Sequence, residues 1–203
     1  ISPMIRAWNR ASVFIAFVGV CATMLAIDRL ASRYRLSNAF IGGLAIALAA
    51  LALWDQKTPS CATCVDANKT AFDNDARFVA SIESRLPAGA AVYQLPYMPF
   101  PEVPPLNQLQ AYDQAVGYLH SRSLKWTYGL MKGRSGDLFF RALSEQPVQQ
   151  QIEVIRKLGF QGVYLDRRGY ADSGAQMEAA LTQAIGRPPM LVSGSNQQVF
   201  FDL

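Results

Sequence analysis

Residues 11–27 read ASVFIAFVGVCATMLAI, and residues 39–54 read AFIGGLAIALAALALW. Neither stretch contains a charged residue, and each is close to the shortest length that crosses the hydrocarbon core of a bilayer as a helix. Apolar runs of this length also occur as buried helices of globular proteins, but here two of them follow each other closely. We therefore expect residues 1–57 to form a transmembrane helical hairpin with spans at about 11–27 and 39–54.

The connector between the two stretches, DRLASRYRLSN, carries three arginines. Short loops rich in arginine stay on the cytoplasmic side of a membrane, which places the rest of the chain on the other side. Arg6 and Arg10, before the first stretch, favour the opposite orientation. We expect the bacterial inner (cytoplasmic) membrane, with the C-terminal domain facing the periplasm. The chain begins with Ile1 and its first apolar run lacks a signal-peptide cleavage pattern, so we expect it to be a piece of a longer protein.

The rest of the 203-residue chain has the patterning of one soluble domain. The formal charge of +4 is modest and partly adjoins the apolar stretches, so nucleic acid is not an expected partner. Residues 73–75 offer an N-cap for a helix, because the apolar residues after them recur at helical spacing. A strand is expected next, at 90–95. A helix over about 144–158, a strand at 162–165, a helix over 173–186 and a closing hairpin (190–193 and 198–203) complete the pattern. We predict a small three-layer α/β domain with a mixed sheet over residues 73–203.

Cys61 and Cys64 form a C-x-x-C pair in the linker that we expect over residues 58–72, and Cys21 lies in the first apolar stretch. Such a pair can be a local disulfide, two free thiols, a redox site or half of a zinc site. Zinc is poorly supported because His120 is the sole histidine and no second cysteine pair exists. We favour a local disulfide in an oxidising compartment, and we expect no metal and no cofactor.

Two segments of the domain carry the chemistry expected of a binding site. The first, PYMPFPEVPPLN (96–107), has five prolines and must be an irregular loop directly after a strand. Such loops often bind ligands in α/β folds. The second, HSRSLKWTYGLMKGR (120–134), has four cations and no acid. Cations, aromatic rings and glycines suit a phosphate, a sugar phosphate or an anionic lipid headgroup, and a solvated basic face is the alternative.

The expected binding residues fall into three chemical roles. Cationic side chains neutralise phosphate, aromatic rings stack on sugars, and carboxylates accept hydrogen bonds from hydroxyl groups. The cations are Lys125, Lys132 and Arg134. The aromatic rings are Trp126 and Tyr97, and the carboxylates are Asp166 and Glu102. Asp166 ends its strand, where α/β folds place functional carboxylates, but it could instead pair with Arg167 or cap the next turn. Asp113 is a further acid near this cleft.

No catalytic residue follows from the sequence. The single His120, without a nucleophile elbow, excludes a Ser-His-Asp arrangement. Carboxylates such as Glu102 and Asp113 could act as general acid and base, but the sequence gives no distance between them.

The segments LPAGAAVYQLPYMPFPE, YLHSRSLKWTYGLMKGR and GFQGVYLDRRGY, with FFDL at the end, carry a family resemblance over residues 70–203. In this order, after membrane helices, they resemble the C-terminal region of bacterial polytopic membrane sugar transferases and translocases, which are similar to GT-C type glycosyltransferases that use polyprenyl-phosphate sugars. The resemblance implies envelope glycan or glycolipid assembly. It transfers no catalytic residue, because the catalytic acid of these enzymes usually lies in their first extracytoplasmic loop.

Two functions are therefore open. The first is part of a membrane glycosyltransferase-like protein whose soluble domain binds sugar or lipid-phosphate groups, with membrane lipid and a polyprenyl-phosphate sugar or glycan as partners. The alternative is a non-enzymatic membrane-tethered binding or scaffold module. A redox-active anchor through Cys61 and Cys64 is a third, weaker hypothesis.

Overall fold

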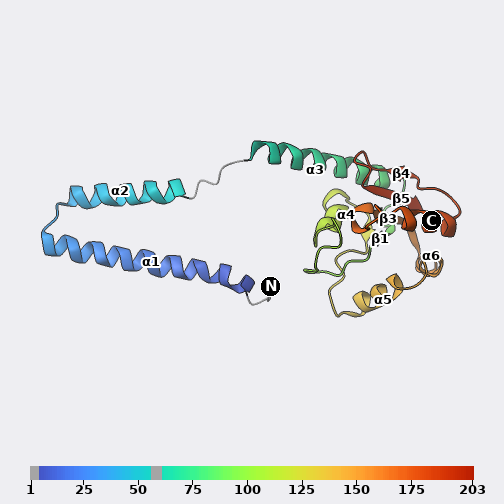
Figure 1. Cartoon of the computed structure of the whole chain (residues 1–203), viewed down its shortest axis with the longest axis horizontal. Coiled ribbons are helices and arrows are strands. Elements are labelled where there is room, and N and C mark those ends of the chain that lie inside the picture. The colour runs from blue at the N-terminus through green and yellow to red at the C-terminus, as the bar shows by residue number, and fades with distance from the viewer. Residues whose placement is uncertain (1–4, 56–60) are drawn as a thin grey trace. The chain divides into compact units, whose positions relative to one another are not determined.

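The computed structural model describes residues 5–55 and 61–203, which fall into two compact units, Ile1–Cys61 and Ala62–Leu203 (Figure 1). The first unit consists of helices α1 (Ile5–Tyr34) and α2 (Asn38–Asp55). Their segments Ala11–Tyr34 and Asn38–Asp55 are long and apolar enough to span a membrane, and neither apolar window is buried in the structure. These helices are therefore not the core of the soluble domain, and they are consistent with membrane association.

The second unit is built on a five-stranded sheet with the strand order β2-β1-β3-β5-β4. Its strands are β1 (Ala91–Leu95), β2 (Lys125–Trp126), β3 (Phe160–Asp166), β4 (Leu191–Val192) and β5 (Gln198–Asp202). Strands β2, β1 and β3 are parallel, whereas β5 runs antiparallel to both β3 and β4. The mixed sheet and the closing hairpin predicted from the sequence are thus confirmed.

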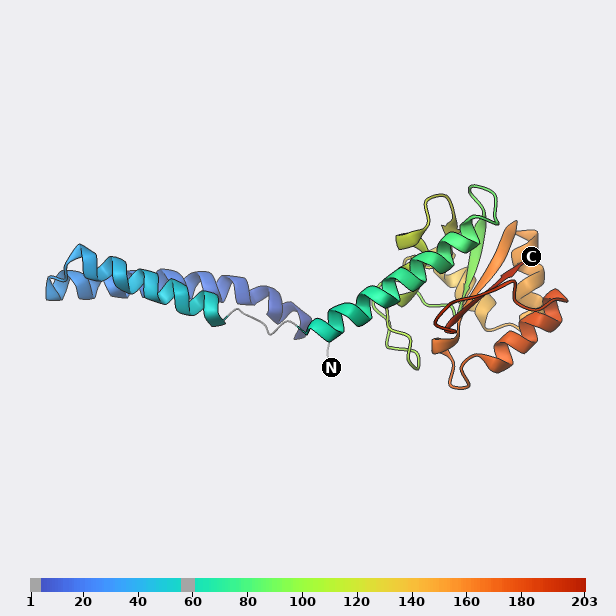
Figure 2. The same ribbon diagram turned by 90° about the horizontal axis from the view of Figure 1, so that it is seen from above.

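Helices cover both faces of this sheet (Figure 2). They are α3 (Ala62–Glu83), α4 (Val116–His120), α5 (Ser135–Ser144), α6 (Val148–Lys157) and α7 (Ala175–Ile185), with 3-10 turns η1 (Asp113–Ala115) and η2 (Arg167–Gly169). Successive strand residues point to opposite faces, so Tyr93 and Val163 pack with α5, α6 and α7, while Val92 and Tyr164 pack with α3. The predicted three-layer α/β architecture is confirmed.

Three local predictions differ from the structure. Helix α3 begins at Ala62 and takes in most of the expected linker, because this stretch holds no proline or glycine to stop it. The helix predicted over about 144–158 begins only at Val148 (α6), because Ser144 belongs to the end of helix α5, which was not predicted from the sequence. Helix α7 begins at Ala175 rather than at residue 173, and the Asp172 carboxylate accepts the N–H groups of Gly174 and Gln176 at its start.

Helix α3 runs from the edge where the parallel strands end, which we call the carboxyl edge, to the edge where they begin. Near its middle, Asp75 accepts a hydrogen bond from Gln198, which pairs with Asp166 at the end of β3. Near its end, Glu83 accepts N–H groups of residues just before β2. Residues 62–74 therefore extend beyond the carboxyl edge, by about 20 Å at 1.5 Å per residue.

Candidate functional site at the carboxyl edge

The carboxyl ends of β1 and β3 form the topological switch point of the sheet. The connection that leaves β1 carries α4 on the α3 face, and the connection that leaves β3 carries α7 on the other face. Because the two connections leave to opposite sides, a crevice opens between adjacent strands, and ligands of α/β proteins bind at such positions. The loops after β1, β2 and β3 and the β4–β5 turn meet here.

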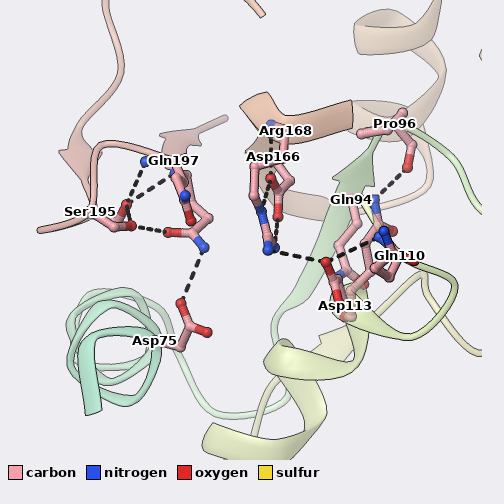
Figure 3. Close-up of polar contacts among 12 residues, drawn as sticks. Asp75, Gln94, Pro96, Gln110, Asp113, Asp166, Arg168, Ser195 and Gln197 are labelled. Atoms are coloured by element: carbon pink, nitrogen blue, oxygen red, sulfur yellow. Dashed lines mark hydrogen bonds and ion pairs between the residues drawn. The ribbon is translucent and has the colours of Figure 1, made fainter. Parts of the chain in front are cut away.

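An ion-pair network lies at this switch point (Figure 3). The fully buried Asp166 accepts hydrogen bonds from Arg168 Nε at 3.0 Å and Nη2 at 2.7 Å, and Arg168 Nη1 lies 3.1 Å from Asp113 Oδ2. Burial acts to lower the pKa of Arg168, but the bonds and charges of both carboxylates outweigh it and raise that pKa. Asp166 also accepts the N–H of Arg168 and caps η2.

This geometry decides between the two interpretations of Asp166. Both of its oxygens are bonded to Arg168, so the carboxylate orients that guanidinium and does not face an open groove. The pairing partner is Arg168 and not Arg167, whose side chain bonds instead to Glu178 and Asn196. A direct hydrogen bond from Asp166 to a substrate hydroxyl does not fit this arrangement.

Two buried glutamines lock the loops of the carboxyl edge together. Gln94 accepts the N–H of Tyr128 at 2.9 Å and donates to the carbonyl of Gln114 at 2.9 Å, which joins β1 to the segments on either side of β2. The side chain of Gln114 in turn donates to the carbonyl of Pro96 at 2.6 Å. Because these bonds are buried, the loops are held in one arrangement.

Behind the network lies the hydroxyl of Tyr164, which is buried and has no hydrogen-bond partner among the described residues. Burial, together with the negative charges of Asp166 and Asp75, raises the pKa of Tyr164 well above its usual value. Burial also raises the pKa of Asp75, which accepts a hydrogen bond from Gln198 at 3.1 Å. The tyrosine is therefore a neutral group that faces acidic neighbours.

A polar groove of about 380 Å³ opens beside η2. Its lining is rich in hydrogen-bonding groups: Asn107, Gln108, Arg167, Arg168, Tyr170, Ala171, Ser173, Asn196 and Gln197. Some of these groups are fixed, since Asn107 donates to the carbonyl of Gly169 at 2.8 Å and Arg167 to Asn196 Oδ1 at 2.5 Å. The side-chain amides of Gln108 and Gln197 bond to no other described residue, so they are available to a ligand.

Some predicted residues come together at this edge. The proline-rich loop pairs with the basic segment, because Phe100 N–H donates to Leu130 and Lys132 N–H donates to Phe100. Lys132 Nζ thereby reaches the backbone carbonyl of Glu102 at 3.1 Å. Arg134, the residue before α5, is exposed close by. Lys125 is also exposed but lies on strand β2, apart from this group.

Of the two predicted sugar-stacking rings, Trp126 is buried and Tyr97 is partly buried. Trp126 is 6% exposed, packs edge-on against Tyr164 and donates its indole N–H to Ser121, because the alternation of β2 turns it inward. The ring of Tyr97 stacks on Phe140, and its hydroxyl donates to Asp137 at 2.7 Å. The burial of Trp126 corrects its stacking role, whereas the stacking role of Tyr97 stays a prediction.

Sequence reasoning missed Asp137, which lies in the first turn of α5 and is fully buried. It accepts hydrogen bonds from Gly133 N–H at 2.8 Å, from Tyr97 and from Arg141. Burial acts to raise its pKa, but these bonds outweigh burial and lower that pKa. Because Asp137 takes the Gly133 N–H, that amide is not available to a phosphate. The sequence shows only that Asp137 is the one acid between Asp113 and Glu145, which does not indicate its burial.

The cysteine pair lies at the start of α3, with Cys61 directly before the helix and Cys64 in its first turn. Both residues are disulfide-bonded in the structure, and Cys21 is a free thiol. The redox state of the pair in the cell stays a prediction. Among the residues that the structure describes, no group of three or more His, Cys, Asp or Glu side chains could hold a metal ion.

Comparison with family models, with curated proteins and with solved structures finds no match to this chain.

Proposed function

We propose that this chain is part of a membrane-anchored, glycosyltransferase-like protein of bacterial envelope glycan assembly. In this proposal the α/β domain binds the sugar of a lipid-linked or polymeric glycan in the groove beside η2. The observation that carries the proposal is the lining of the groove, where four carboxamide side chains and two guanidinium groups surround a volume of about 380 Å³.

The chemistry of this lining matches a carbohydrate. Carboxamides both donate and accept hydrogen bonds, so they can bond the neighbouring hydroxyl groups of a sugar. The volume lies within the range of small-molecule sites. Arg167 and Asn107 are held by protein hydrogen bonds, which reduces the entropy that they lose on binding.

The direction of α3 favours a substrate that is linked to the membrane. The chain enters the domain from the side of the carboxyl edge, where residues 62–74 project, and two helices that could span a membrane precede it. The groove therefore opens on the edge from which the tether leaves. With the arginine-rich connector in the cytoplasm, the domain would lie on the periplasmic side, where lipid-linked glycans are presented.

The proposed role of the domain is to hold the substrate. Asp166 and Asp113, the carboxylates at the switch point, are both paired with Arg168, so they are poorly suited to act as a general acid and base. The same observation favours the second candidate, a non-enzymatic binding module. The two differ in whether the longer protein transfers sugar, and the binding site is the same in both.

The test measures binding to the full chain in nanodiscs, with soluble oligosaccharides and an undecaprenyl-phosphate-linked sugar as probes. Replacing Gln108 and Gln197 by alanine should weaken binding roughly 30-fold, since each lost hydrogen bond contributes about 1 kcal/mol. The matched control is Gln161→Ala, an exposed glutamine at the opposite edge of the sheet. Equal binding by the groove variant and the control, or no binding of any probe, would overturn the proposal.

A further inference from the structure

The outward side of helix α5 is unusually apolar. Leu138 is 58% exposed and Phe139 is 45% exposed, and Met131, just before the helix, is 50% exposed. The inward side of the same helix is already packed, because Asp137 and Leu143 are buried against the domain. The exposed apolar side chains are therefore a second face of α5, and the domain itself does not cover it.

Positive charge borders this face. Lys132 and Arg134 are exposed, and Arg134 lies one helical turn before Leu138, whose N–H bonds to its carbonyl. The acid of this stretch, Asp137, is buried and bonded to Arg141, so it does not offset the two cations at the surface. Apolar side chains flanked by lysine and arginine are typical of segments that lie in the headgroup region of anionic membranes.

The position of the face suits a membrane as well. Helix α5 begins at the carboxyl edge, since it follows the loop after β2, and the first residues of α3, where the chain enters the domain, project from the same edge. Helices that could span a membrane would keep the domain at high local concentration beside a bilayer. Even a weak affinity of this face for lipid would then give a large docked fraction.

We propose that Met131, Lys132, Arg134, Leu138 and Phe139 form a docking face that binds the anionic lipid surface of the membrane in which the chain is anchored. Leu138, Phe139 and Met131 enter the headgroup region, and the two cations bind lipid phosphates. A second copy of the chain fits less well, because a two-fold contact would set these cations against their own copies. The proposal is independent of ligand binding in the groove.

The experiment compares hydrogen exchange of the full chain in nanodiscs of phosphatidylcholine alone and in nanodiscs that also contain phosphatidylglycerol. We expect the amides of α5 to exchange more slowly in the anionic discs. Replacing Lys132 and Arg134 by alanine should weaken docking roughly 25-fold, since each cation near an anionic surface contributes about fivefold. Replacing Leu138 and Phe139 by serine should abolish the protection.

The matched control is Leu158→Ser, because Leu158 is 53% exposed but lies at the opposite edge, just before β3. This variant should keep the protection of α5. Because Lys132 and Arg134 are exposed, their alanine variant tests the proposal even if the serine variant fails to fold. Equal exchange in both kinds of disc would overturn the proposal. So would protection that follows protein concentration, which indicates a second copy, or an equal loss in the Leu158→Ser variant.

Discussion

Replacing Arg168 by methionine tests the network at the switch point most directly. The guanidinium bonds both oxygens of Asp166, which is fully buried, and also pairs with Asp113, whose side chain is 27% exposed. Methionine has a similar length and no charge. The substitution therefore leaves the Asp166 carboxylate buried without a counter-charge, while most of the packing is retained.

The expected cost follows from this burial. Removing one partner of a buried ion pair destabilises proteins by about 3–5 kcal/mol. Because Arg168 is 21% exposed, water can partly replace it, and we expect a loss of about 3 kcal/mol. For a domain of this size, that loss lowers the melting temperature by roughly 10 °C.

The assay is thermal unfolding of the full chain in detergent, followed by the near-ultraviolet circular dichroism of the aromatic core. The control is Arg187→Met, which removes a more exposed pair with Asp202 (side chains 49% and 26% exposed) and should cost less than about 1 kcal/mol. Adding Asp166→Asn to the Arg168→Met variant should recover part of the loss, because the unpaired charge is removed. If Arg168→Met costs no more than Arg187→Met, the reasoning about this network is refuted.

Further predictions concern Asp137, the cysteine pair and a packed glycine. The folded domain lowers the pKa of Asp137 below its ordinary 3.8, so its contribution to stability should be complete above about pH 4–5 and decline as the pH falls through the lowered pKa. The difference in unfolding free energy between wild type and Asp137→Asn, measured by urea titration from pH 7 to pH 3, should shrink over that acid range; a constant difference contradicts this. Thiol titration of the denatured, unreduced chain should label Cys21 alone, whereas labelling of Cys61 and Cys64 would show that the pair is reduced. Gly162→Ala should cost about 1–3 kcal/mol in chemical unfolding, because an added Cβ would meet the ring of Phe200 at 2.3 Å. Gly194→Ala, where the nearest atom is 3.8 Å away, should change stability by less than about 0.5 kcal/mol, and equal effects of the two substitutions would contradict this packing argument.

Much of the fold could be predicted from local patterns. The apolar runs of α1 and α2, the helical periodicity of α6 and α7 and the buried strands β1 and β3 all follow from residues close together in the chain. Strand β2 could not be predicted, since two residues carry no periodicity and Lys125 and Trp126 pair only because β1 offers an edge. Helix α5 is short and begins among glycines, and its inward face is recognisable only once Tyr97 and Gly133 surround Asp137.

The residues of the candidate groove were not predicted: none of the expected binding residues lines it, namely Glu102, Lys125, Trp126, Lys132, Arg134 and Asp166. The rule that ligands bind where parallel strands end led to the loops after β1 and β3, and both loops do meet at the switch point. The roles predicted for individual side chains agree less well with the structure. Asp166 is bonded to Arg168, and Trp126 is in the core, because burial and partners depend on which distant segments pack against a residue.

The sequence by itself determined that two apolar helices precede an α/β domain, because hydrophobic length and periodicity are properties of neighbouring residues. The tertiary structure alone decided that Asn107, Arg167 and Asn196 share one groove and that Leu138 and Phe139 remain uncovered. Contacts of this kind join segments far apart in the chain, and their geometry exists only when the strands have taken their order in the sheet.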